Sequence, residues 1–421
     1  MSAGRNEDGD AAWVRATPDA TRGSHALKIL IAIGVSRKKE AGAAGVVLNH
    51  AAELTKRGHE VECWFLEDVF ERPAKLRRFE ALIFAWRIAQ RIWRAPGKYD
   101  VVNLHAPWGC VYGVWRAMTR ATNAPPYVLT MQGSEERYVR AMRAENRKGR
   151  AWNFSWKNRL WHRVYHQTMY DLAIRTAEFG AVANREAWIC AELKYGREPG
   201  LIWYVPNGVE ERFFAVREYP ETNEPRLLFV GTWLDRKGVY YLAEAFRIVA
   251  KNVPGARLTV AGSSASEEEV KRFFASEVRD RVRVIPFVTR EEIPKVYAEH
   301  DVFVFPSLVE GMPLTLLEAM ATGLPVVTTN TSGMADVVEH DVNGLLVPPA
   351  AAEELAGCVE KLCVSAELRN RLGIAGQQSM RRYTWETVTG QLEKVFELAR
   401  KRSGAGGAAN EQRAQALGGG A

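Results

Sequence analysis

The sequence predicts an α/β protein with two doubly wound domains, each built on a parallel sheet, that face each other across a central cleft. Short apolar runs alternate with longer amphipathic segments, which is typical of strands joined by crossover helices. The alternation stops around Pro206, Asn207 and Gly208 and then starts again. The length of 421 residues fits two or three domains of about 150 residues each.

The first domain is predicted at residues 26–206, after a polar segment at residues 1–25 that we expect to be disordered. Helices are expected at residues 46–57, which Gly58 would end, at 76–94 and over 135–176. Five aliphatic runs predict its buried strands, at residues 26–33, 60–65, 100–104, 127–130 and 180–183.

A linker is predicted at residues 207–225, where turn residues show no period. The second domain then covers residues 226–384, and Thr289 with Glu292 forms a capping box before one of its helices. Its strands are expected at residues 226–230, 257–261, 282–286, 302–305, 325–328 and 344–347. A last helix at 385–402 precedes a Gly/Ala-rich tail, 403–421, that we expect to be disordered.

The composition excludes several classes of protein. The five cysteines are scattered and form no CxxC pair, which argues against a disulfide framework or a zinc site. No apolar run of about 18 residues predicts a membrane span, and the first residues lack the apolar core of a secretory signal. The net charge of +7 indicates an anionic partner without choosing between nucleic acid, a membrane surface and nucleotide phosphates.

The segment 301–323 carries the most informative pattern. An apolar strand leads into a loop with Glu310, and Pro313 suits the first turn of the helix that follows. Free N–H groups of residues 311–315 would attract an anion such as a diphosphate. Glu318 is placed to accept hydrogen bonds from a ribose. Two glutamates at this spacing also occur by chance. The prediction of a ligand site therefore depends on their position on either side of a helix start that follows a buried strand.

A second loop with phosphate-binding character follows the strand at 226–230. Gly231 permits a sharp turn, and Arg236 and Lys237 place two cations before a helix at 238–251. No carboxylate is expected to neutralise both cations. We predict that Lys237 binds a phosphate as a point charge and that Arg236 is solvated.

The first domain offers candidates for the opposite wall of the cleft. Gly42 and Gly45 permit close approach of the backbone to a ligand, or serve helix packing. His105 follows a strand directly, so it either bonds a sugar hydroxyl or is structural. The sequence contains no metal-binding motif and no GxSxG nucleophile motif, so no metal site is expected.

Together these motifs resemble retaining glycosyltransferases of the GT-B fold, in the family 4 group that uses nucleotide sugars. The resemblance runs from about Leu27 to Phe396, and its most specific part is the E-x7-E motif from Glu310 to Glu318. Supporting segments are PNGVEERFF, GTWLDRKG and NGLLVPP, with AGAAGVVLNHAAELTKRGHEV and DVVNLHAP in the first domain.

The resemblance implies a role for each matching position. Glu318 would bind the ribose, Glu310 the donor sugar and Lys237 the diphosphate, and His105 would lie near the reacting centre. His105, Glu310 and Lys237 are thus the expected catalytic residues. The other expected donor-binding residues act largely through their backbone or as supplementary groups: Gly42, Gly231, Arg236, Gly311, Met312, Pro313, Leu314 and Thr315.

Enzymes of this kind move a sugar from a donor such as a UDP- or GDP-sugar to a hydroxyl of a glycan, lipid-linked or small-molecule acceptor. The leaving phosphate acts as the base, and no metal or other cofactor is implied. Two positions depart from the family pattern. Thr232 stands where many relatives have Arg, and Gln132, before Gly133 on the acceptor side, stands where they often have His; Gln132 can bond a hydroxyl but cannot act as acid or base.

Two basic, aromatic segments belong to the first domain. Residues 140–163 combine Arg and Lys with Trp, which suits an anionic lipid surface or a glycan acceptor, or else a solvated face above core tryptophans. The segment 79–94 has an apolar face that would pack on the sheet or bind an anionic membrane surface. The residues of this face are Phe79, Leu82, Ile83, Trp86 and Trp93. We expect a cytoplasmic protein, with peripheral contact at the inner face of the membrane as one interpretation.

Other functions stay open at this point. A GT-B sugar-nucleotide epimerase would share the fold. A catalytically silent GT-B protein could instead act as a scaffold in glycan assembly, as Thr232 and Gln132 would allow. Nucleic-acid binding follows from charge alone, and no recognised nucleic-acid module supports it, so no nucleic-acid partner is expected.

Overall fold

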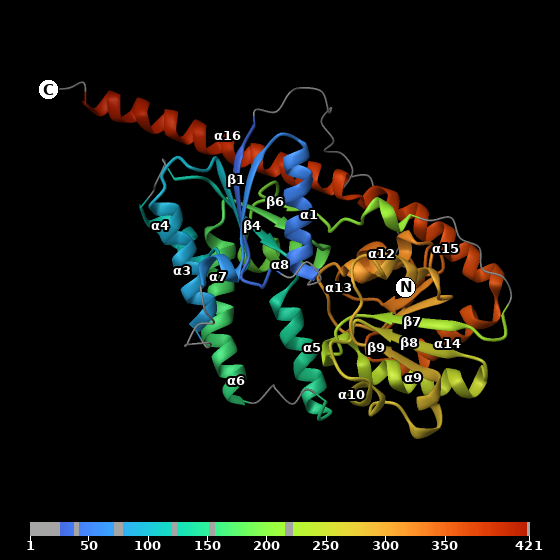
Figure 1. Cartoon of the computed structure of the whole chain (residues 1–421). Helices are drawn as coiled ribbons and strands as arrows, with labels where there is room; N and C mark the ends of the chain where they lie inside the picture. The colour runs from blue at the N-terminus through green and yellow to red at the C-terminus, as the bar shows by residue number, and fades with distance from the viewer. Residues whose placement is uncertain are drawn as a thin grey trace, which may run out of the picture.

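Two six-stranded parallel sheets form the framework of the molecule, which a computed structural model describes over residues 26–37, 42–70, 79–119, 124–150, 156–214 and 222–418. The two sheets belong to separate α/β domains that lie against each other (Figure 1). The predicted fold class is therefore confirmed. The segment 1–25, predicted to be disordered, lies outside the described residues.

The first sheet has the strand order β2-β1-β3-β4-β5-β6, with all strands parallel. Five strands match the predicted runs. The sixth, β6, was not predicted because three residues at a sheet edge carry no readable period. The bounds are β1 Lys28–Ala32, β2 Glu60–Trp64, β3 Val101–His105, β4 Tyr127–Met131, β5 Phe179–Val182 and β6 Ile202–Tyr204.

Helices cover both faces of this sheet. The helices α1 (Gly42–Lys56) and α16 (Trp385–Gly418) share an apolar core with one face. The other face is covered by α3 (Glu80–Trp93), α4 (Cys110–Thr119), α7 (Gln167–Thr176) and α8 (Arg185–Tyr195), and the short α2 (Leu66–Val69) lies near α3.

The helical segment predicted over 135–176 is confirmed at residues 135–147 and 156–176, where the chain makes two arms. The helix α5 (Glu135–Arg147) ends before Gly149, whose φ of +72° is a left-handed conformation that terminates helices. Residues 151–155 lie outside the described set. The second arm runs through α6 (Trp156–Trp161) and a π-helical turn, η2 (His162–His166), into α7.

The second sheet has the order β12-β11-β10-β7-β8-β9. The chain thus winds outwards from the centre in both directions, as in dinucleotide-binding folds, with the switch point between β7 and β10. Ligands bind such sheets where the carboxyl ends of the two central strands diverge. The strands are β7 Arg226–Val230, β8 Arg257–Ala261, β9 Val282–Ile285, β10 Val302–Phe305, β11 Val326–Thr329 and β12 Leu345–Val347.

The helices of the second domain join these strands. Before α11, Thr289 and Glu292 make the predicted reciprocal capping contacts: Thr289 N donates to Glu292 Oε2 at 3.1 Å, and Glu292 N donates to Thr289 Oγ1 at 3.3 Å. The helices are α9 Val239–Asn252, α10 Glu267–Lys271, α11 Ile293–Ala298, α12 Leu314–Ala321, α13 Ser332–Val337, α14 Ala352–Val364 and α15 Ala366–Met380. Single 3₁₀ turns are η3 Glu211–Phe213, η4 Asp235–Lys237, η5 Ser276–Arg281 and η6 Arg381–Tyr383.

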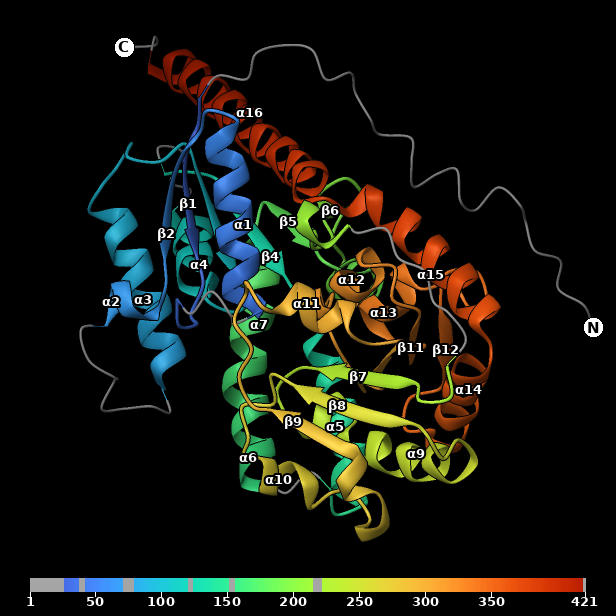
Figure 2. The same ribbon diagram turned by 45° about the vertical axis from the view of Figure 1, so that its right-hand side comes forward.

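The chain crosses between the domains twice at one place. After β6 it passes through Val209, whose N–H donates to the Tyr383 carbonyl at 2.8 Å. Trp385 begins α16 there and packs so close to Gly208 that a Cβ on this glycine would lie 2.7 Å from the Trp385 ring. From this point α16 returns across the first domain (Figure 2).

The helix α16 is longer than the sequence predicted. It was expected to end at residue 402, and it extends to Gly418. The earlier end was predicted from glycines at positions 404, 406 and 407, which disfavour a helix, but the segment contains no proline after Trp385 to block one and its alanines favour it. Residues 419–421 lie outside the described set.

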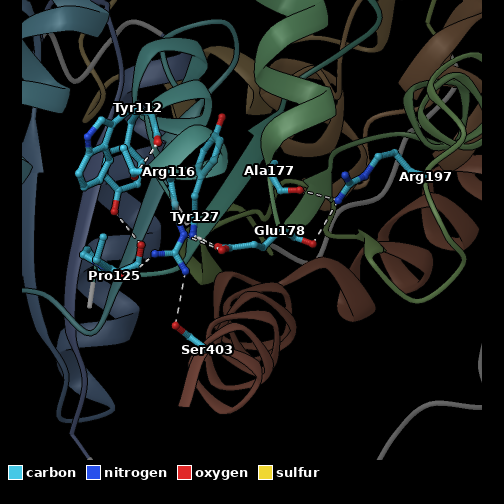
Figure 3. A network of polar contacts seen from close by, with 11 residues as sticks. Tyr112, Arg116, Pro125, Tyr127, Ala177, Glu178, Arg197 and Ser403 are labelled. Carbon is cyan, nitrogen blue, oxygen red and sulfur yellow. Dashed lines mark hydrogen bonds and ion pairs between the residues drawn. The ribbon is translucent and has the colours of Figure 1, made fainter. Parts of the chain in front are cut away.

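A polar network ties α16 to the amino-terminal edge of the first sheet (Figure 3). Arg116 Nε donates to Glu178 Oε1 at 2.6 Å, and Arg116 Nη2 reaches Ser403 Oγ at 3.4 Å. The second oxygen of Glu178 accepts the Tyr127 N–H. Arg197 donates to the carbonyls of residues 177 and 178. The edge opposite the cleft is thereby fixed by two partly buried arginines, Arg116 and Arg197.

Phe396 is the side chain through which we expect α16 to stabilise the first domain most. It is 0% exposed and packs in the core shared by α1 and the sheet. Phe396→Ala is expected to lower the free energy of unfolding by about 3–5 kcal/mol, because it leaves a cavity. Urea denaturation followed by circular dichroism measures this. The control is Leu398→Ala, at a side chain 37% exposed, which should cost less than about 1 kcal/mol; equal losses would contradict the assignment.

Candidate functional site

The loops after β7 and β10 meet at the switch point of the second sheet. Leu308 N donates to the Arg236 carbonyl at 2.8 Å, and Ser307 Oγ donates to the same carbonyl at 3.0 Å. Gly238 has a φ of +73°, and a Cβ there would lie 1.9 Å from the Pro306 carbonyl oxygen. Glycine at 238 is therefore required for the close approach of the two loops.

Glu310 lies between both cations of the β7 loop. Its Oε1 is 2.9 Å from Lys237 Nζ, accepts a hydrogen bond from Ser307 Oγ at 2.9 Å, and pairs with Arg236 Nη1. The predictions that Arg236 is solvated and that no carboxylate neutralises both cations are therefore wrong. They failed because the partner is 74 residues away in sequence. Ser307 is a member of this cluster that the sequence did not reveal.

The cluster is largely removed from solvent. Lys237 is 8% exposed and its ammonium lies over the Phe305 ring, 4.9 Å from the centroid. Burial alone would raise the pKa of Glu310, but the charges of Lys237 and Arg236 hold it below its usual value. Two cations therefore share one carboxylate, and the cluster keeps a net positive charge available to an anion.

Gly231 lies directly beside this cluster. Its φ of +150° is unfavourable for residues with a side chain, and a Cβ there would contact Lys237 Cε at 3.7 Å. Thr232, where relatives often have Arg, is exposed. Position 232 therefore supplies no cation, but Arg236 joins Lys237 as a second cation on the Glu310 carboxylate.

Glu318 projects from α12, the helix that begins just after Pro313. Tyr297 Oη donates to Glu318 Oε2 at 3.0 Å and to the Thr315 carbonyl at 3.1 Å. Burial raises the pKa of Glu318 to about 7, although the bond from Tyr297 opposes this. The carboxyl group is therefore half protonated near neutrality and available to donors from a ligand. Tyr297 was not found from the sequence, since nothing local links it to Glu318.

Residues 311 and 312 are held by the first domain. Asn184 Nδ2 donates to the Gly311 carbonyl at 2.9 Å, and Asn207 Nδ2 donates to the Met312 carbonyl at 2.7 Å. A Cβ on Gly311 would lie 1.5 Å from the Gln132 carbonyl oxygen. Gln132 and Gly133 thus form the opposite wall directly against residues 310–313, the loop after β10 that is the expected donor loop. The two asparagines carry no sequence signal beyond the turn around Asn207.

The first turn of α12 contains further expected donor residues. Pro313 precedes the helix, so the first N–H groups of α12 have no partner inside it. Thr315 Oγ1 is buried, and no described residue bonds it. Leu314 packs against the cluster formed by Val46 of α1 with Trp385 and Val388 of α16. Gly42 itself is exposed, with no atom within 4 Å of a Cβ built on it, so it is near α12 without touching it.

His105 ends β3 and is 3% exposed, facing a small internal pocket rather than open solvent. The pocket is also lined by Gln132, Asn207 and His50. Burial, with His50 nearby, lowers the pKa of His105 to about 3, so its ring is neutral at physiological pH. No described residue bonds its Nδ1. A neutral ring at this place can hydrogen-bond a hydroxyl but carries no proton to donate as an acid.

The basic helices of the first domain divide into buried and exposed faces. The helix α3 packs inwards through Phe84, Ile88 and Ile92, and it leaves Phe79, Leu82 and Trp86 39–47% exposed. Of the predicted apolar face, Phe79, Leu82 and Trp86 therefore do not pack on the sheet, whereas Trp93 packs against the core on this side of it. Across the described residues, no helix is long and apolar enough to cross a membrane, and no three His, Cys, Asp or Glu side chains gather as a metal site.

Two family models match adjoining parts of the chain. Residues 41–213 match Glycosyltransferase Family 4, and residues 211–379 match Glycosyl transferases group 1. AmsK, an amylovoran biosynthesis glycosyltransferase of Erwinia amylovora, is 34% identical over 37% of this chain and 40% of its own length. An Escherichia coli α-1,3-galactosyltransferase that uses UDP-Gal and GlcNAc-diphosphoundecaprenol is 25% identical over 68% of this chain and 71% of its own.

The fold also matches solved structures. Sucrose-phosphate synthase from Thermosynechococcus elongatus superposes with a TM-score of 0.69 at 18% identity, over 88% of this chain and 98% of the other. The two doubly wound domains, with a site at the switch point of the second, define a protein of the GT-B class. The two models together cover residues 41–379, and the chain belongs to the glycosyltransferases of group 1.

Proposed function

We propose that the chain transfers a sugar from a nucleotide-sugar donor to an acceptor hydroxyl with retention of the anomeric configuration. The observation that carries this proposal is the cluster of Glu310, Lys237 and Arg236 at the switch point, facing the helix that carries Glu318. The cations and the start of α12 would meet the diphosphate, and the carboxylate of Glu318 would meet the ribose. These protein groups follow one another in the same order as the diphosphate and the ribose in a nucleoside diphosphate sugar.

In the proposed reaction the diphosphate lies at the start of α12 and against Lys237. The acceptor oxygen bonds to the anomeric carbon on the face from which the diphosphate leaves. The bond from that carbon to the phosphate oxygen breaks, and the phosphate takes the proton of the acceptor hydroxyl. Lys237 and Arg236 stabilise the charge that grows on the leaving group. The chain needs no nucleophile of its own in this scheme.

Glu310 would orient the donor sugar while it keeps the two cations in place. Its carboxylate is already ionised and fixed by three partners before any ligand arrives. Such preorganisation lowers the cost of ordering the site during reaction. Gln132, next to the donor loop, would hydrogen-bond an acceptor hydroxyl, and neutral His105 would lie behind it.

A panel of UDP- and GDP-sugars tests the proposal. Calorimetry measures which nucleoside diphosphate binds, and proton NMR of the released or transferred sugar reports its anomeric configuration. An α-linked product from an α-linked donor supports retention, whereas an inverted product contradicts it. Isomerised free nucleotide sugar would indicate an epimerase, and tight donor binding without hydrolysis or transfer would indicate a silent scaffold.

The affinity for the nucleotide is expected to rise with pH through the range where Glu318 ionises. Ribose hydroxyls donate to a carboxylate, so they favour the ionised form of a group whose pKa is about 7. Below this pH a proton must leave on binding, and the Kd should weaken by up to about tenfold per pH unit. Charged groups facing Glu318 are Glu210, Arg290 and Arg212.

Glu318→Gln is the control for this dependence. The diphosphate also titrates, with a pKa of about 6, and contributes equally in both proteins. Calorimetric titrations of UDP from about pH 6 to about pH 8 should therefore show a steeper slope for the wild type than for Glu318→Gln. Equal pH dependence of UDP affinity in the two proteins would contradict the assignment of Glu318 to the ribose site.

The acceptor and the place of action are also part of the proposal. A glycan or lipid-linked acceptor would enter from the first domain, and the exposed Phe79, Leu82 and Trp86 with Arg87 and Arg91 of α3 suit peripheral contact with an anionic membrane. Vesicle co-sedimentation of the wild type and Trp86→Ala measures that contact. Equal sedimentation of the two proteins would contradict a role for α3.

A further inference from the structure

A basic groove separates the two helical arms of the first domain. It lies between α5 and the arm of α6, η2 and α7, which stand side by side below the first sheet in Figure 1. Its volume is about 580 Å³. Five cationic side chains line it: Arg140, Arg143, Arg147, Arg163 and Lys194.

The groove carries more positive charge than its own carboxylate neutralises. Glu136, the one carboxylate among its described lining residues, pairs with Arg140 at 3.3 Å and with Lys194 at 3.2 Å. Arg143 and Arg147 form no ion pair with any carboxylate in the described ranges, and the same is true of Arg163. Cations gathered in one hollow repel each other, and an anion placed there relieves the repulsion.

One wall of the groove is rigid because the opposite face of α5 docks on the second domain. Met142 packs with Tyr241 and Leu308, and Tyr241 Oη donates to Glu145 Oε1 at 2.7 Å. The groove-lining residues of α5 are spaced three or four positions apart, which places them together on the other face of the helix. Their arginines therefore project from a fixed support.

The groove continues towards the donor loop. A narrower pocket shares Glu136, Gln167 and Lys194 with it and reaches Gly133. A Cβ on Gly133 would lie 3.2 Å from Gly311 Cα, so this pocket ends beside the donor loop. The accessible volume of this pocket is only about 10 Å³, so the groove and the loop after β10 are connected through shared lining residues and not by an open channel.

We propose that this groove binds the phosphate or diphosphate group of the acceptor and so holds the acceptor on the first-domain side of the site. Arginine forks bind phosphate oxygens two at a time, which fits several guanidinium groups around one hollow. A concave groove suits a discrete phosphate better than the flat surface of a bilayer. The inference rests on the proposed transfer reaction for its role, but the anion site itself does not depend on that reaction.

Calorimetric titration with inorganic pyrophosphate tests the site, with UDP present to occupy the donor loops. The variant is Arg143→Ala/Arg147→Ala, at two exposed positions whose replacement leaves the core unchanged. The matched control is Arg247→Ala/Arg283→Ala, which removes two exposed cations from the second domain. The groove variant should bind pyrophosphate at least about tenfold more weakly than the wild type, and the control should bind it equally well.

Equal pyrophosphate affinity in wild type and groove variant overturns the proposal. A second result also overturns it. If pyrophosphate does not bind, and the protein binds phosphatidylglycerol vesicles but not phosphatidylcholine vesicles in a way that requires Arg143 and Arg147, the groove serves a membrane surface instead. Failure of UDP to bind contradicts the proposed function instead. In that case, pyrophosphate affinities of the groove variant and the control variant, measured without nucleotide, still show whether the groove binds an anion.

Discussion

Replacing Lys237 by methionine is expected to reduce sugar transfer by about 10²–10³-fold, as the loss of a preorganised charge does at other sites. The buried ammonium lies 2.9 Å from Glu310, in the region where we propose that the diphosphate binds. Methionine fills a similar volume, and Arg236 still pairs with Glu310, so no carboxylate is left buried without a partner. The protein should therefore fold normally and lose function.

The measurement that isolates this effect compares ligands. Affinity for UDP should fall by about tenfold to a hundredfold, while affinity for uridine should not change, because only the diphosphate meets the lost charge. The control is Lys251→Met, at an exposed lysine at the end of α9. Wild-type UDP affinity in the Lys237→Met variant would contradict the assignment of the cation cluster to the proposed donor site.

Gly311→Ala is expected to prevent the two domains from closing on each other. The added Cβ would lie 1.5 Å from the Gln132 carbonyl oxygen, which belongs to the other domain, so the backbones must separate. Overpacking of this kind costs about 1–3 kcal/mol, which corresponds to roughly a 5- to 150-fold loss of the closed state. Transfer should fall by that factor, and the radius of gyration from X-ray scattering should rise.

The matched control is Gly357→Ala in the middle of α14. A Cβ there meets no atom within 4 Å, so the substitution should increase stability by about 0.5–1 kcal/mol and leave transfer unchanged. Folding of Gly311→Ala is checked by its melting curve. A well-folded Gly311→Ala protein with wild-type transfer would show that the closed contact is not needed for catalysis.

Most of the fold was predictable because it depends on local patterns. Buried parallel strands such as residues 226–230 and 302–305 are short aliphatic runs between helical segments, and the structure has them at those places. Two features with weak local patterns were missed. The edge strand β6 is only three residues long, and the break after α5 depends on one glycine, Gly149, in a left-handed conformation.

The candidate site shows the same division. Glu310, Glu318 and Lys237 were identified because a motif surrounds each of them. Their partners come from remote segments: Tyr297 bonds Glu318 from the helix before β10, and Asn184 holds Gly311 from the other domain. The pairing of Arg236 with Glu310 joins two loops that meet only because β7 and β10 are neighbours in the sheet.

The two chain crossings between the domains share one location, where Val209 bonds Tyr383 and Trp385 covers Gly208. The covalent links therefore act as a single hinge at one side of the molecule. Rotation about this hinge leaves every strand of both sheets paired, and it separates Gly311 from Gln132. Opening of the molecule then requires breaking interdomain hydrogen bonds and the apolar contact of Met142 with Tyr241 and Leu308, without unfolding either half.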